Sequence, residues 1–338
     1  MSPTVEAPAR TEPASRGFAV RLARTERLSE SFLRLTFTGE DLDQFAATTL
    51  DQRIKFVLPA ACGTAVDPTL FDAPDWYATW RSLSDDERPT LRTYTVRAVR
   101  PEAKEIDVDV VLHGIVPGAP AATDCPLRSL HACVCADAVG PAVRWCATAS
   151  AGDGLVIIGP NARFEGPQSG IEWDPPSGAH TYLVAGDETA VPAVSSILES
   201  LPAGVRAHVF LEVPTADDVM DLEVPEGVEV QWLPRRGEAT TAERGTLLDL
   251  AVRAGATRIA QRQHAARLGQ DPEDVDIETT ILWDVPSEPS APEGVYAWIA
   301  GEAGVVKELR RFLVRDLGLD RSAVAFMGYW RAGRSEGS

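Results

Sequence analysis

The hydrophobic pattern of the chain changes at the Pro-Pro-Ser-Gly turn of residues 175–178, and this change limits the possible folds more than any other feature. Before the turn, short runs of alternating or β-branched residues are separated by turn residues, as is typical of strands. Six strands at this spacing predict a small antiparallel barrel. The predicted strands are 18–22, 32–38, 53–58, 93–99, 106–112 and 154–159.

After the turn, strand-like runs alternate with helix-like runs. This alternation predicts an open parallel sheet with helices on both faces. The predicted strands are 181–185, 207–212, 228–232 and 295–300, and the predicted helices are 190–200, 246–254 and 305–317. The fold class expected is therefore β followed by α/β.

The resulting domain division has three parts and three interruptions. Residues 1–16 are rich in Pro, Ala, Ser and Glu and are expected to form a disordered tail. The barrel domain is expected over 17–177 and the α/β domain over 178–338. Residues 67–89, with Trp76, Tyr77 and Trp80, are expected to form a short helical excursion. Insertions are expected over 115–139 and 258–292.

The composition excludes several classes of protein. A formal net charge of −18 argues against nucleic-acid binding, which needs a basic surface. No run approaches the roughly 18 apolar residues of a membrane span, and the N-terminus has no apolar signal-peptide core. We therefore expect a cytoplasmic protein, and a monomer, of 338 residues.

Four of the five cysteines, Cys125, Cys133, Cys135 and Cys146, fall within 22 residues. Four thiolates can hold zinc or an iron–sulfur cluster, but this spacing lacks the C-x2-C pairs that present two thiolates to one metal. An odd count without a secretion signal also argues against a disulfide framework. We expect reduced, ordinary cysteines and no metal.

The run RTYTVR at 92–97 has the residue types that a flavin needs. Tyr94 offers a flat face for the isoalloxazine ring, and Thr95 offers a hydroxyl and an N–H near the edge of that ring. Arg92 and Arg97 can pair with a pyrophosphate. Taken alone, the same pattern also fits a half-buried strand with solvated arginines.

Downstream, GPAVRW at 140–145 predicts a helix start at which Gly140 lets a ligand approach and Pro141 fills the first turn. The N–H groups of Ala142 and Val143 there suit a pyrophosphate. In the second half, two glycine turns each end a strand and begin a helix. Two such turns on one sheet predict a nucleotide crevice. The turn residues are Gly186, Asp187, Glu188, Thr189, Gly301 and Glu302.

The choice between NADH and NADPH is argued from the end of the second α/β strand. Glu212 there can accept hydrogen bonds from a ribose diol and would repel a 2′-phosphate, which favours NADH. Arg235 and Arg236, after the next strand, would reverse this preference by pairing with that phosphate. The sequence favours NADH.

These blocks, together with DVDVVLHG at 107–114, AGDGLVIIGP at 151–160, AGDETAVPA at 185–193, WIAGEAGVVKELRRFL at 298–313 and GYWRAG at 328–333, resemble the siderophore-interacting proteins. These are flavin-dependent ferric-siderophore reductases of the ferredoxin-reductase superfamily. The blocks occur in the family's order from about residue 17 onward. The insertions 115–139 and 258–292 depart from the family pattern.

The resemblance implies an FAD-binding barrel, an NAD(P)H-binding α/β domain and electron transfer to a ferric siderophore, with no acid–base residue. The residues it implies for FAD are Arg92, Tyr94, Thr95, Asp109, Val110, Leu112, His113, Gly140, Pro141, Ala142, Val143 and Trp145. For NAD(P)H it implies the six turn residues and Glu212, and for the siderophore Lys55 and Arg331. Two alternatives stay open: a siderophore- or flavin-binding protein fed by a ferredoxin, and another flavin-dependent reductase on the same scaffold.

Overall fold

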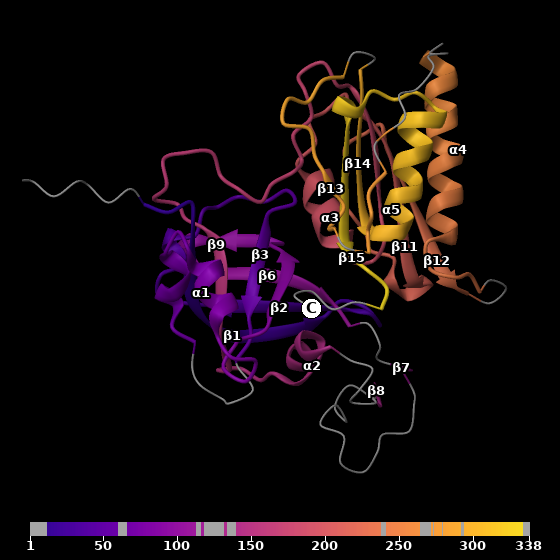
Figure 1. The fold of residues 1–338 in the computed structure, drawn as a ribbon. Helices are drawn as coiled ribbons and strands as arrows, with labels where there is room; N and C mark the ends of the chain where they lie inside the picture. Colours follow the sequence, from indigo (N-terminus) through magenta and orange to yellow (C-terminus); the bar gives the residue numbers. More distant parts are fainter. Residues whose placement is uncertain are drawn as a thin grey trace, which may run out of the picture.

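The computed structural model describes residues 12–59, 66–112, 116–117, 132–133, 140–237, 241–263, 272, 274–278, 280–291 and 294–333. Figure 1 shows a mainly β domain followed along the chain by a domain in which helices cover a sheet. None of the helices in the described ranges is long and apolar enough to cross a membrane.

The first domain is built on a seven-stranded antiparallel sheet with the order β4-β3-β9-β1-β2-β6-β5. Its strands are β1 (Ser15–Arg27), β2 (Phe32–Thr38), β3 (Arg53–Val57), β4 (Leu91–Thr95), β5 (Ala98–Arg100), β6 (Glu105–Val111) and β9 (Gly154–Pro160). Two short strands, β7 (Val116–Pro117) and β8 (Ala132–Cys133), pair with each other in the expected insertion.

The sheet is curled because its two edge strands are consecutive in the chain. β4 and β5 stand at opposite ends of the strand order, yet only Val96 and Arg97 separate them, a link that spans about 10 Å at most. The Val96 N–H donates to the Gln52 carbonyl (2.9 Å) and the Arg97 N–H donates to the Asp107 carbonyl (2.8 Å). The predicted barrel is confirmed, with the predicted strand 93–99 divided between its two edges.

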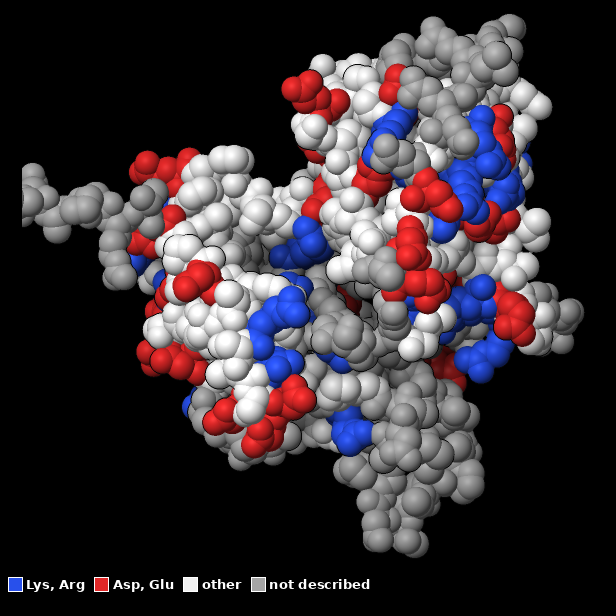
Figure 2. Space-filling view, viewed as in Figure 1, with Lys and Arg blue, Asp and Glu red and all other residues white. Residues whose placement is uncertain are grey.

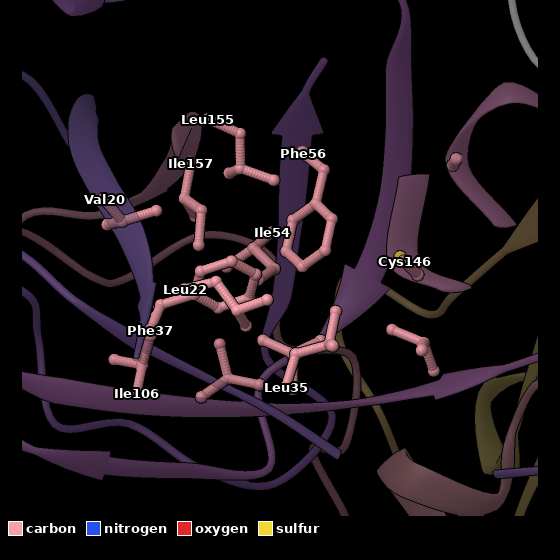
Figure 3. Packing of buried hydrophobic residues seen from close by; sticks show 14 of the residues in the cluster. Val20, Leu22, Leu35, Phe37, Ile54, Phe56, Ile106, Cys146, Leu155 and Ile157 are labelled. Carbon is pink, nitrogen blue, oxygen red and sulfur yellow. The ribbon is translucent and has the colours of Figure 1, made fainter. Parts of the chain in front are cut away.

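Residues of β3 alternate between the two sides of this sheet. Ile54 and Phe56 point into the barrel core, which Figure 3 shows together with Phe37 and Ile157. Val57 faces the opposite way, into an outer cluster formed by η2 (Pro68–Asp72) and α1 (Trp76–Ser82). The expected excursion is therefore helical in part, and it covers the outer face of β3, β4 and β9. The helix α2 (Pro141–Thr148) contributes Ala142, Val143 and Cys146 to the inner core.

The second domain has a six-stranded sheet with the order β12-β11-β10-β14-β15-β13, parallel except for the edge strand β13. Figure 1 shows α3 on one face and α4 and α5 on the other. The strands are β10 (Thr181–Gly186), β11 (Arg206–Thr215), β12 (Val228–Arg236), β13 (Trp283–Asp284), β14 (Val295–Glu302) and β15 (Val324–Trp330). The helices are α3 (Val191–Glu199), α4 (Thr246–Gln263) and α5 (Ala303–Arg310), and α5 continues as a π-helix, η6 (Arg311–Asp316).

The structure differs from the expected elements at several points. Strand β15 was not expected, although its residues Val324–Met327 are buried as completely as those of β14, which was. Helix α4 runs to Gln263, past the expected end at residue 254 and into the expected insertion. The first strand begins at Ser15, before the expected start at residue 18.

The two domains share an apolar cluster and a set of buried hydrogen bonds. Phe32 and Val111 of the barrel pack in the same cluster as the residues of α3. Asp51, just before β3, accepts hydrogen bonds from the Trp173 N–H (3.1 Å) and from the Trp298 indole on β14 (3.2 Å). Asp51 thus joins the barrel, the interdomain segment and the second sheet.

The Asp51 carboxyl makes the stability of this junction depend on pH. Burial raises its pKa from 3.8 to about 6. An acid whose pKa is raised on folding stabilises the protein at low pH, and this contribution is lost as the pH rises through about 6. The shift corresponds to about 3 kcal/mol. We predict that the unfolding free energy of the native chain, minus that of Asp51→Asn, falls by about this amount between about pH 4 and pH 7. A difference that stays constant over this range in urea titrations would contradict the assignment.

Candidate functional site

Strand β4 sorts the R-x-Y-T residues onto two faces. Arg92 and Tyr94 lie opposite Phe56 and Ile54 of β3 and therefore face inward. The Tyr94 ring lies 4.6 Å from the Phe56 ring, and its hydroxyl is hydrogen-bonded to the thiol of Cys146. Arg92 donates to the Leu91 carbonyl (2.7 Å). Thr95 faces the other way and is buried.

Helix α2 packs against the same barrel core as Tyr94. Gly140 caps it with extended backbone, and a Cβ added there would meet no protein atom within 4 Å in the described residues. Packing among the described residues therefore does not require the glycine, whereas close approach of a ligand would. The Ala142 and Val143 side chains are buried, which leaves their backbone N–H groups as the groups that can face a ligand.

Other residues expected to contact FAD are packed within the protein. Val110 and Leu112 have side chains in the barrel core, and Trp145 stacks on Phe37 at 6.2 Å. Asp109 receives two hydrogen bonds from Arg34, at 2.7 and 2.8 Å. Val110 and Leu112 can therefore contact a ligand only through their backbone. The expected contact at His113 lies outside the described residues.

Arg97 is not placed as expected for a pyrophosphate ligand. Its guanidinium donates to Glu199 on α3 (2.9 Å) and lies 3.7 Å from Asp109. Arg97 therefore bridges the two domains. Of the two arginines expected to pair with a pyrophosphate, Arg92 remains as the candidate.

Cys146 is a packing residue. Burial raises the pKa of its thiol to about 12, so it stays protonated at neutral pH. Within the described part of the chain, no group of His, Cys, Asp and Glu is arranged to hold a metal ion. The side chains of Cys125, Cys133 and Cys135 lie outside the described residues, so the absence of a metal stays a prediction.

The two glycine turns of the α/β domain lie side by side, as the sequence predicts. Gly186 pairs with Ala300 across β10 and β14, and the strand order reverses between these two strands. In open α/β sheets this reversal is where ligands bind. Gly301 has φ +146°, and a Cβ there would lie 2.9 Å from an Asp187 oxygen. The tight approach explains why this turn needs glycine.

Two carboxylates, Asp187 and Glu302, lie at the expected nucleotide crevice and are hydrogen-bonded within the protein. Asp187 is buried, and it accepts hydrogen bonds from the Thr189 N–H (2.9 Å), the Glu302 N–H (2.9 Å) and the Trp330 indole (2.8 Å). Burial, followed by the charge of Glu188, raises the pKa of Asp187 to about 6. Asp187 thus ties together the ends of β10, β14 and β15.

The backbone N–H groups at the start of α5 also have hydrogen-bond acceptors within the protein. The Glu302 side chain accepts hydrogen bonds from the Gly304 N–H (2.7 Å) and the Val305 N–H (3.0 Å). These are the amides that would otherwise bind an anion at a helix start. Phosphate binding there would require Glu302 to move.

Glu212 is not available to a ribose, and this corrects the expectation based on it. Its side chain is fully buried, and its oxygens accept from the Gly245 N–H (2.7 Å), the Leu248 N–H (2.9 Å) and Arg235 (3.1 Å). The carboxylate caps α4 in place of binding a nucleotide. The stated reason for preferring NADH is therefore absent.

Arg235 is likewise occupied. It donates to both oxygens of Glu188, at 2.8 and 3.0 Å. Burial would raise the pKa of Glu188, but the hydrogen bonds and charge of Arg235, with the charge of Arg244, lower it. Arg236 is the exposed member of the expected arginine pair.

The expected siderophore residues have different surroundings. Lys55 is partly exposed on the outer face of β3 and donates to the Thr93 hydroxyl of β4 (2.9 Å). Arg331 donates to the Ile277 carbonyl (2.6 Å) and pairs with Glu278. The expected insertion therefore supplies partners for Arg331.

Residues that the sequence did not indicate connect β3 to β13 and β15. Arg53, two residues before Lys55, stacks over the Trp283 ring at 4.3 Å and pairs with Glu172. Trp283 in turn stacks on Tyr329 at 5.9 Å. Figure 2 shows Lys and Arg side chains gathered where the two domains meet. No local pattern marks these contacts, because Arg53 and Trp283 lie far apart in the sequence.

Two family models match almost the whole chain. Residues 21–164 match the siderophore-interacting FAD-binding domain, and residues 179–333 match the siderophore-interacting protein model. The chain belongs to the siderophore-interacting protein family. Uncharacterized protein Rv2895c of Mycobacterium tuberculosis is 30% identical over 94% of this chain and 91% of its own length.

A second relative, the ferric vibriobactin reductase ViuB of Vibrio cholerae, is 26% identical over 93% of this chain and 89% of its own length. The crystal structure of the siderophore-interacting protein SipS from Aeromonas hydrophila matches with a TM-score of 0.60 and 27% identity, covering 96% of this chain and 95% of that one. Ferredoxin and cytochrome b5 reductases match at TM-scores of 0.51 and 12% identity, which confirms the ferredoxin-reductase-like fold alone.

The Glu188–Arg235–Glu212 network can be tested against a neighbouring control. Arg235→Ala would leave two buried carboxylates without their main cation, and we predict a loss of about 3–5 kcal/mol in the unfolding free energy. Arg236→Ala removes the same side chain from an exposed position and should change stability by less than about 0.5 kcal/mol. Chemical denaturation measures both variants. Equal losses would show that the network does not hold this domain together.

Proposed function

We propose that this protein reduces ferric siderophores in the cytoplasm, passing electrons from NAD(P)H through FAD to the bound iron. The observation that carries the proposal is the convergence of β4, the end of β6 and the start of α2 at one end of a domain that belongs to an FAD-binding family. The reductase activity named for ViuB supports the choice of substrate.

The residues at this end of the barrel fit FAD. Tyr94 offers a half-buried ring, Arg92 lies on the same face of β4, and Gly140 leaves open space before the first amides of α2. Arg92 and the amides of Ala142 and Val143 would hold the pyrophosphate, and Tyr94 would flank the ring system. The bound flavin supplies the conversion of a two-electron hydride donor into one-electron transfers.

The protein's own task is then to position its substrates. Ferric iron is bound far more tightly than ferrous iron by hard oxygen chelators, so reduction releases the metal without acid–base catalysis. Lys55 supplies a fixed cation for an anionic chelate on the outer face of β3. Because Arg331 is already paired with Glu278, we assign it a smaller share in binding the chelate than Lys55.

NAD(P)H is proposed to bind at the switch point between β10 and β14. Because Glu212 and Arg235 are both sequestered, we assign no preference between NADH and NADPH. The carboxylates Asp187 and Glu302 at this crevice favour a second candidate, in which a ferredoxin supplies the electrons and the crevice binds no pyrophosphate.

The FAD site can be tested at its glycine. Gly140→Val should weaken FAD binding at least tenfold, because a branched side chain would fill the space in which the cofactor approaches. The stability of the apoprotein should change by less than about 0.5 kcal/mol, since no described atom lies in the way. Gly237→Val is the control, because that glycine is also open and also lacks a positive φ. FAD affinity is measured by fluorescence titration. The assignment would be contradicted if Gly140→Val, like Gly237→Val, bound FAD as tightly as the native chain does.

The reductase activity is tested in its second half-reaction. FAD-loaded protein, reduced chemically under argon, is mixed with an anionic ferric chelate while a ferrous-specific dye traps the product. We expect ferrous iron to appear as flavin absorbance returns. The KM for the chelate should be higher in Lys55→Met than in the native protein, and the difference should shrink in high salt because salt screens the attraction of Lys55. Flavin that stays reduced in the presence of every ferric chelate would refute the proposed function.

A further inference from the structure

A fully buried carboxyl group of the α/β domain, that of Asp218, holds the turn between β1 and β2 of the barrel. Asp218 ends η5 (Ala216–Asp218), the short helix that follows β11. Its oxygens accept hydrogen bonds from the Ser29 hydroxyl (2.6 Å), the Ser31 hydroxyl (2.9 Å) and the Ser31 N–H (2.9 Å). They also accept from the N–H and the hydroxyl of Thr215, both at 3.0 Å. Three of these five hydrogen bonds therefore cross from one domain to the other.

The contacts of Asp218 favour one geometry of the two domains. None of its five donors carries a charge, and burying a carboxyl group is costly unless well-placed hydrogen bonds satisfy it. On both sides of the serines, Leu28 and Phe32 pack in the apolar cluster of the α/β domain. The turn is therefore held by polar contacts at its centre and by apolar contacts at its two ends. We call Asp218 with Ser29 and Ser31 the Asp218 clasp.

The Asp218 clasp connects the two regions in which the proposed ligands bind. On the barrel side, the Ser31 carbonyl accepts a hydrogen bond from the Leu112 N–H (2.8 Å), at the end of β6 that is proposed to contact FAD. On the other side, Asp218 follows the carboxyl end of β11, which is parallel to β10. The carboxyl ends of parallel strands lie at one edge of the sheet, and the proposed nucleotide crevice lies at that edge.

The clasp is also separated from the junction at Asp51. Asp51 binds Trp298 of β14, whereas the clasp lies at the end of β11, and β10 stands between these two strands. Two strand spacings amount to about 10 Å. Domains attached at a single point could rotate about it, whereas attachment at two separated points restricts that rotation. The hydrogen bond from Arg97 to Glu199 of α3 restricts it further.

We propose that Asp218 is a positioning residue for hydride transfer, because it fixes the flavin end of the barrel against the nucleotide crevice. Hydride transfer requires the reacting atoms to lie about 3–3.5 Å apart, and a misplacement of about 1 Å can slow such a step about a hundredfold. The hydride donor and acceptor are held by different domains, so this step depends on the angle between the domains. Transfer to the chelate depends on it less, because Lys55 and the flavin site both belong to the barrel. This inference rests on the proposed function.

The test measures the two half-reactions separately in FAD-loaded Asp218→Ala. With the nucleotide that reduces the native protein, present at saturation, anaerobic stopped-flow absorbance should show flavin reduction slowed about tenfold or more. The affinity for the nucleotide should not change, because no residue of the crevice is altered. Reoxidation of chemically reduced flavin by a saturating ferric chelate should stay near the native rate. Asp217→Ala is the matched control, since it removes an exposed carboxylate at the adjacent position and should change neither rate.

Amide hydrogen exchange gives a readout that does not use catalysis. The Leu112 N–H bonds to the Ser31 carbonyl and not to Asp218, so its exchange reports whether the turn is held against the end of β6. Exchange at Leu112 should be faster in Asp218→Ala than in the native protein and unchanged in Asp217→Ala. Ser31→Ala removes one crossing hydrogen bond from the barrel side, so it should slow flavin reduction by less than Asp218→Ala does.

The positioning role is refuted alone if Asp218→Ala reduces its flavin at the native rate, if both half-reactions slow equally, or if the loss lies in nucleotide affinity. Each of these results requires that the native protein is reduced by a nucleotide, so the proposed function survives them. Native protein whose flavin neither NADH nor NADPH reduces would refute the nicotinamide step of the proposed function, and the role of Asp218 in hydride transfer with it.

Discussion

Two buried carboxylates, Asp51 and Glu172, hold the barrel and the α/β domain together. Asp51 binds the Trp298 indole at 3.2 Å, and Glu172 binds Arg53 and the Trp283 indole. Desolvation offsets most of the attraction in the Glu172–Arg53 pair, and Asp51 stabilises the fold only below its raised pKa. Their geometry is specific, however, so they favour one arrangement of the two domains. The proposed substrate site depends on that arrangement, because Lys55 lies on the barrel and Arg331 lies on the α/β domain.

Carboxylates also limit how electrons can enter. Glu302 covers the first amides of α5, and Asp187 fills the turn after β10. The proposed nicotinamide dinucleotide would therefore have to bind without these helix starts as its main phosphate site. The fold supplies the position of the crevice, and side chains remote in sequence decide its chemistry. Glu212 illustrates this: its place at the end of β11 matches a ribose-binding acid, while its hydrogen bonds make it a helix cap.

The sequence was most informative where local pattern determines structure. The barrel strands were predictable because they are short alternating or β-branched runs bounded by turn residues, and the glycine turns because Gly186 and Gly301 each follow a strand-like run and precede a helix-like one. Strand β15 was missed although β14, which is buried on both faces as well, was predicted. The hydrogen bonds of Glu212 and Arg97 and the Arg53–Trp283 contact were not predicted, because each depends on a partner from a distant part of the chain.

The complete path of electrons is tested by anaerobic absorbance of the FAD-loaded protein. NADH or NADPH is added first, and an anionic ferric chelate follows once the flavin absorbance is steady. The account predicts that at least one nucleotide bleaches the flavin band and that the ferric chelate restores it with release of ferrous iron. A flavin band that neither nucleotide bleaches, in protein whose chemically reduced flavin still reduces the chelate, would contradict the nicotinamide step and leave a ferredoxin as the donor.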